Sequence, residues 1–131
     1  MAFRPLRAGA ALLWRREPWW AELWSGLTAV GWGATGVAAT GVWPSMAVLA
    51  RLGGVGFWEA AGLGLGCVQL ALLAADARWL RWAGEAGMAW FWGVLTLGVW
   101  VAVPGAPAVA VYAGWCGINL YSSVRLLRPH G

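Results

Sequence analysis

Three side chains that could carry chemistry lie within apolar stretches of the sequence: Glu59, Gln69 and Asn119. A carboxylate or a carboxamide is costly to bury in a membrane, so each is a candidate functional residue. Glu59 lies only about four residues, or roughly 6 Å, inside the expected end of its helix, and could simply reach the lipid headgroups. Gln69 and Asn119 are expected in the same half of two helices that run in the same direction. This placement predicts a hydrogen bond between them.

The residues that catalysis or metal binding would need are scarce. The only histidine, His130, lies in the C-terminal tail, and Cys67 and Cys116 lie in apolar stretches, where cysteine behaves as a small hydrophobic residue. The sequence contains no HExxH, GxSxG or Walker-type motif and no Cys/His cluster with metal-binding spacing. We therefore expect no enzyme, no metal site and no cofactor.

The composition indicates the elements that must position these groups. Of the 131 residues, 61% are hydrophobic and only 11% are charged, which is far from the soluble average. Apolar runs of near-membrane length recur, separated by short segments rich in charges, Pro and Gly. This pattern predicts an all-α bundle of four transmembrane helices. All nine basic residues are Arg, which is typical of a bacterial or phage genome of high GC content.

The chain divides into a basic N-terminal segment, residues 1–17, and a transmembrane domain, residues 18–131. The segment is weakly amphipathic and is expected to be a short interfacial helix or a solvated tail. The expected spans cover residues 18–42, 55–75, 86–103 and 106–124. Residues 44–54 could be a loop or a short interfacial helix. We expect residues 77–87 to form an interfacial loop.

Arginine counting gives the orientation. If the N-terminus is inside, the outside holds only Arg51, and the cytoplasmic side holds Arg4, Arg7, Arg15, Arg16, Arg78, Arg81, Arg125 and Arg128. The positive-inside rule then places both termini in the cytoplasm, so the chain is N-in/C-in, and a bacterial inner membrane is the expected location.

Tryptophan and the small residues suggest how the helices are anchored and packed. Most of the thirteen tryptophans, Trp58 and Trp92 among them, lie near expected span ends, and only Trp32 and Trp115 are mid-span. The anchors we single out are Trp19, Trp20, Trp24, Trp43, Trp79 and Trp82. Helices in lipid associate where small residues let their backbones approach. The candidates for such packing are Gly26, Ala29, Gly33, Gly36 and Thr40 on the first span, and Gly62 and Gly66 on the second.

These features are compatible with three functions. The first is a non-catalytic accessory or scaffold subunit that packs in the bilayer against a larger membrane assembly or against copies of itself. The second is a pore-forming protein similar in size and span number to phage holins. The third is a small transporter or channel subunit in which Glu59, Gln69, Asn119 and Tyr112 line the path. The arginines flank the apolar runs, so we expect no nucleic acid partner.

Overall fold

The computed structural model describes residues 19–38, 43–75 and 77–128, and all regular structure within them is helical. The all-α prediction is therefore confirmed for this part of the chain. The predicted N-terminal interfacial helix and Thr40 lie outside the described residues. The elements are α2 Trp19–Ala38, η1 Pro44–Met46, α3 Ala47–Arg51, α4 Val55–Ala75, α5 Arg78–Ala102 and α6 Pro107–Leu127.

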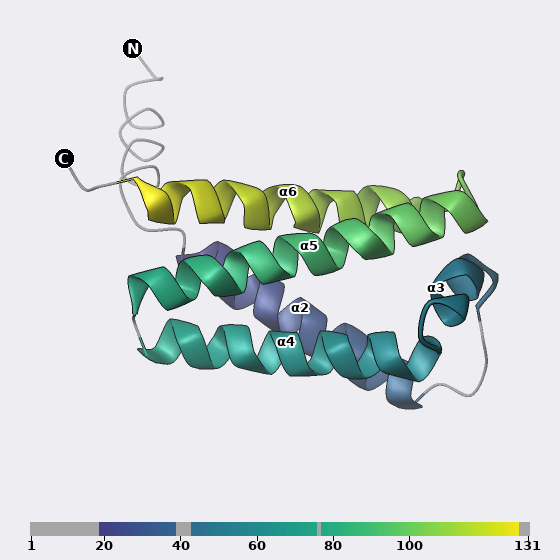
Figure 1. Cartoon of the computed structure of the whole chain (residues 1–131), viewed down its shortest axis with the longest axis horizontal. Coiled ribbons are helices and arrows are strands. Elements are labelled where there is room, and N and C mark those ends of the chain that lie inside the picture. Colours follow the sequence, from purple (N-terminus) through teal and green to yellow (C-terminus); the bar gives the residue numbers. More distant parts are fainter. Residues whose placement is uncertain (1–18, 39–42, 76, 129–131) are drawn as a thin grey trace, which may run out of the picture.

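The four long helices form an antiparallel bundle in which each runs opposite to the next along the chain (Figure 1). The most extensive contacts are between α2 and α4 and between α5 and α6, so the bundle consists of two tightly packed pairs. The pairs meet mainly along α4 and α5. The short elements η1 and α3 pack against α5 at the end of the bundle where α4 begins.

Glycines on α2 and α4 allow the two helix backbones to approach closely. A Cβ atom at Gly33 would lie 2.5 Å from the backbone oxygen of Glu59 and 2.6 Å from the backbone nitrogen of Leu63. A Cβ at Gly66 would lie 2.8 Å from the backbone oxygen of Gly26. Because real Cβ atoms do not come this close to backbone, these positions require glycine as long as the helices keep this spacing.

The segment before α4 is a short helix rather than an irregular loop. Pro44 begins a 3-10 turn that leads into α3, and the turn to α4 uses Gly53 and Gly54, whose φ angles are 149° and 85°. Glycine adopts these positive angles without the steric cost that a Cβ would bring. The buried side chain of Leu49 packs closely against Gly98 of α5, where an added Cβ would lie 2.6 Å away.

Residues 77–87 are not the interfacial loop expected from the sequence. Helix α5 begins at Arg78, eight residues before the expected start of the third span. The charges at Arg81 and Glu85 had suggested a break, but both side chains are buried and interact with other helices. A charged residue that has a partner inside the bundle does not need to end a helix.

The limits of α4 and α6 are close to those expected, and the predicted end of the first span at residue 42 lies outside the described residues. Helix α4 covers the predicted range, and α6 continues three residues past the predicted end at position 124. The side chain of Arg78 closes this end of the bundle: its Nε donates to the backbone oxygen of Leu126 at 2.7 Å, and its terminal nitrogen donates to that of Arg128. These bonds satisfy carbonyl groups that the end of a helix leaves free.

Two of the helices, α4 and α5, are long and apolar enough to cross a membrane. Among the residues that the structure describes, twenty large hydrophobic side chains are exposed, including Trp79 at 70% and Val37 at 64%. Glu22, Arg81 and Glu85 are instead at most 3% exposed. The described part of the molecule thus has an apolar exterior and charged groups in its interior.

Replacing Gly33 by alanine should separate α2 from α4. The new methyl group would overlap the α4 backbone, so we expect the free energy of unfolding to fall by about 1–3 kcal/mol. Titration of the purified protein from mild detergent into dodecyl sulfate measures this change. Gly31 is the matched control, because nothing lies within 4 Å of a Cβ at that position. Equal stability of the Gly33→Ala and Gly31→Ala proteins would contradict the described helix contact.

Candidate functional site

Eight buried polar residues gather at the end of the bundle where α2 and α5 begin and α4 and α6 end. We call this set the buried polar cluster, and it consists of Glu22, Ser25, Gln69, Arg81, Glu85, Asn119, Ser122 and Ser123. All four long helices contribute to it. It therefore ties together both helix pairs of the bundle.

An ion pair between α2 and α5 forms one side of the cluster. The Arg81 side chain donates from Nε to Oε2 of Glu22 at 2.8 Å and from a terminal nitrogen to Oε1 at 2.6 Å. The two side chains are 3% and 1% exposed. A bidentate pair of this kind fixes geometry as well as charge, and removing one partner would leave the other buried and uncompensated.

Carboxamide groups form the other side of the cluster. Gln69 of α4 donates from Nε2 to Oε1 of Glu85 on α5 and, at 3.4 Å, to Oδ1 of Asn119 on α6. Ser25 of α2 donates to the same Asn119 oxygen at 2.9 Å. The structure thus brings Gln69 and Asn119 together, as the sequence suggested, and places Ser25 and Glu85 beside them. These hydrogen bonds connect α2, α4, α5 and α6.

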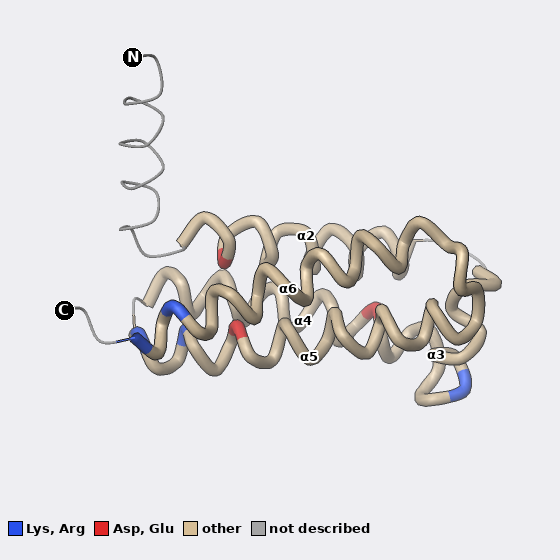
Figure 2. Tube along the Cα trace, turned by 90° about the horizontal axis from the view of Figure 1, so that it is seen from above, with Lys and Arg blue, Asp and Glu red and all other residues tan. Residues whose placement is uncertain are grey.

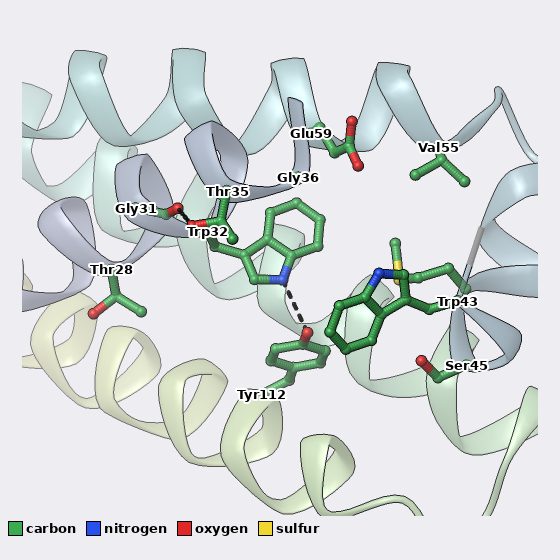
Figure 3. A pocket seen from close by; sticks show the side chains of 11 residues that line it. Thr28, Gly31, Trp32, Thr35, Gly36, Trp43, Ser45, Val55, Glu59 and Tyr112 are labelled. Atoms are coloured by element: carbon green, nitrogen blue, oxygen red, sulfur yellow. Dashed lines mark hydrogen bonds between the residues drawn. The ribbon is translucent and has the colours of Figure 1, made fainter. Parts of the chain in front are cut away.

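A separate cavity of about 420 Å³ lies toward the opposite end of the bundle. We call it the aromatic pocket, because Trp32, Trp43 and Tyr112 form much of its wall (Figure 3). Its size falls within the range of small-molecule sites. The other lining residues are Thr28, Gly31, Thr35, Gly36, Ser45, Met46, Val55 and Glu59.

Glu59 lies in the wall of the aromatic pocket, beside Gly36 of α2. A Cβ at Gly36 would lie 2.5 Å from Cγ and 2.6 Å from Oε1 of the Glu59 side chain. Gly36 therefore provides the space that lets the glutamate fold against α2 and face the cavity (Figure 3). The interpretation that Glu59 is simply interfacial does not predict this placement.

An aromatic cluster supports the pocket from the bundle interior. Trp32 donates from Nε1 to the hydroxyl of Tyr112 at 2.9 Å, and its ring meets that of Phe91 edge to face at 5.8 Å between centroids. The centroid of the Trp92 ring lies 5.5 Å from that of Tyr112 and 6.4 Å from that of Trp115. Such contacts stabilise aromatic pairs beyond their buried area, and they hold the pocket wall in place.

The tryptophans divide between surface and interior. Trp19, Trp20, Trp24, Trp43, Trp79 and Trp82 are all exposed. Trp58 and Trp92, which the sequence suggested as anchors near span ends, are instead 5% and 0% exposed. Trp58 donates to the backbone oxygen of Leu49, and Trp92 packs within the aromatic cluster, so both are core residues. Distance from a span end does not show which way a ring faces.

The candidate residues that the sequence named therefore belong to two sites. Gln69 and Asn119 are in the buried polar cluster, whereas Glu59 and Tyr112 line the aromatic pocket. The packing residues Gly26, Gly33, Gly62 and Gly66 lie buried between helices, as does Ala29.

Sequence reasoning missed Glu22, Arg81 and Glu85 as members of a site. A signal was present, because Arg81, Glu85, Met88 and Trp92 recur at helical spacing, which would place the two charges on the same face as core residues. Glu22 precedes Ser25 and Gly26 on α2 with the same spacing. We took charged residues to mark the ends of helices, so we did not recognise that these charged residues share a helix face with core residues.

Comparison of the chain with protein-family models, with curated proteins and with solved structures gives no match. Within the described residues, no group of three His, Cys, Asp or Glu side chains could hold a metal ion. The functional argument therefore depends on the geometry of the two sites and of the surface.

Removing one member of the buried ion pair should destabilise the protein more than removing both. Arg81→Met leaves the Glu22 carboxylate buried without its bidentate partner, at an expected cost of about 3–5 kcal/mol in the free energy of unfolding. In the Glu22→Leu/Arg81→Met protein both charges are replaced by apolar groups, so the loss should be well below the sum of the single losses. Additive losses in this double-mutant cycle would show that the two side chains do not interact.

Proposed function

We propose that this chain is a small, non-catalytic polytopic membrane protein that crosses a bacterial inner membrane four times and serves as an accessory or scaffold subunit. The apolar exterior and charged interior of the described residues carry this proposal. A soluble protein would expose its charges and bury its large hydrophobic side chains. The exposed apolar side chains are therefore expected to face lipid rather than water.

The lengths of the helices support four spans. Helices α2 and α6 have 20 and 21 residues, and a helix of about 20 residues is about as long as the hydrocarbon core is thick. The antiparallel arrangement would carry the chain across the bilayer four times (Figure 1). The buried polar cluster gives Glu22, Arg81 and Asn119 partners inside the bundle, which lowers the cost of placing them in lipid.

Charge distribution supports the N-in/C-in orientation. Basic residues gather at the end of the bundle where α5 begins and α6 ends, and one lies near α3 at the opposite end (Figure 2). The first group includes Arg78, Arg81 and Arg125, and the arginine described at the opposite end is Arg51. By the positive-inside rule, the basic end faces the cytoplasm, and the α3 end with the aromatic pocket faces outward.

The accessory role is supported by the outer face of α4. Gly56, Ala60, Gly64, Cys67 and Ala71 are exposed there at helical spacing, opposite the buried face that contacts α2. Nothing lies within 4 Å of a Cβ built on Gly56 or Gly64. A small-residue face of this kind lets another transmembrane helix approach closely. The partner helix would come from a larger membrane assembly or from a second copy of the chain.

Photocrosslinking from Cys67 tests this role. A Cys116→Ala protein labelled at Cys67 with benzophenone maleimide and irradiated in native membranes should give a protein adduct, which mass spectrometry identifies as a second copy or another membrane protein. Gly64→Leu should reduce the yield at least fivefold, because the larger side chain blocks close approach. The matched control carries the label at position 97 instead, by Leu97→Cys in a Cys67→Ala/Cys116→Ala chain, since Leu97 is exposed on α5.

Two outcomes would contradict the accessory role. Adducts with lipid alone, or adducts whose yield does not depend on Gly64, would mean that no helix packs against α4. An abrupt loss of membrane potential at a fixed time after induced expression would favour the holin-like alternative, in which the chain forms a pore.

A further inference from the structure

The aromatic pocket is not needed for helix packing or for an accessory role. The pocket, of about 420 Å³, is open to the surface, where the Trp43 side chain is 67% exposed, so a ligand could enter it. It is bounded by mainly apolar groups, several of them aromatic, together with a few polar side chains from α2, η1, α4 and α6. Its walls therefore indicate what it could hold.

The Glu59 carboxyl group lines the pocket. Glu59 faces the cavity from α4, and in the described part of the chain its carboxylate forms neither a hydrogen bond nor an ion pair (Figure 3). Arg81 is bound to Glu22 in the buried polar cluster, toward the other end of the bundle. A carboxylate in a largely apolar cavity favours a cationic ligand.

The aromatic walls favour a particular kind of cation. Trp32 and Tyr112 are held to each other by their hydrogen bond, and the indole of Trp43 lies beside them across the cavity (Figure 3). Indole and phenol rings attract cations through their faces, and they prefer cations that shed water easily, such as substituted ammonium groups. A small metal ion would need several oxygen ligands, whereas the pocket offers one carboxylate.

We propose that the aromatic pocket binds a substituted ammonium ion, with its positive charge near the Glu59 carboxylate and its alkyl groups against Trp32, Trp43 and Tyr112. The ammonium group could belong to a free organic cation or to a lipid headgroup, since both present the same chemistry. In the proposed orientation the pocket faces the outer side of the membrane, where either source would reach it.

Calorimetric titration of the purified full-length protein in maltoside detergent with choline tests the proposal. Choline should bind, whereas 3,3-dimethylbutan-1-ol, which has the same shape without the charge, should bind at least tenfold more weakly. Glu59→Gln keeps the size of the side chain and removes its charge, so its affinity for choline should fall at least tenfold. Trp43→Phe should also weaken binding, and the matched control Trp79→Phe, at an exposed tryptophan outside the pocket, should bind as the unaltered protein does.

Lipid nanodiscs distinguish the two sources. If the natural ligand is a lipid headgroup, free choline should bind in phosphatidylglycerol discs and be displaced in phosphatidylcholine discs. If it is a free cation, the affinity should be the same in both. Thermal unfolding of each variant confirms that it is folded. The proposal is overturned if the neutral alcohol binds as tightly as choline, if Glu59→Gln leaves the affinity unchanged, or if choline does not bind the folded protein.

Discussion

The burial of Glu22, Arg81 and Glu85 inside a bundle with an apolar surface is the constraint on which the rest of the structure depends. Burying an ionisable group is costly unless it has a partner, and here Glu22 bonds to Arg81 of another helix and Glu85 bonds to Gln69 of another helix. The Arg81–Glu22 pair joins α2 to α5, while Gln69 and Asn119 connect α4 and α6 to the same cluster. One end of the bundle is thereby fixed by polar bonds that act between all four long helices.

The other end of the bundle is organised by close backbone packing. Gly33 brings α2 against α4, and Gly36, one turn further along, leaves space for the Glu59 side chain. The aromatic cluster around Trp92 then holds Trp32 and Tyr112 at the pocket wall. The two ends of the bundle therefore differ: polar bonds hold one end together, and the other end contains the aromatic pocket. In the proposed topology the first end faces the cytoplasm, and the pocket faces outward, where the proposed ligand would reach it.

The sequence predicted the elements better than the sites. Hydrophobic run length placed α4 correctly, and small-residue spacing named the glycines that lie between α2 and α4. Periodicity failed where charge was taken as a boundary, so the first two turns of α5, with Arg81 and Glu85, were assigned to a loop. The pocket could not be predicted, because Glu59, Trp32 and Tyr112 are brought together by the crossing of three helices rather than by local spacing.

We propose that this chain, with its apolar exterior and inward-facing polar cluster, is a four-span membrane protein with both ends in the cytoplasm. Reporter fusions measure this directly. Green fluorescent protein should fluoresce at either terminus, and alkaline phosphatase should be inactive there but active when inserted between Gly53 and Gly54. Termini that report opposite sides of the membrane, or a chain that stays in the aqueous fraction without detergent, would contradict the account.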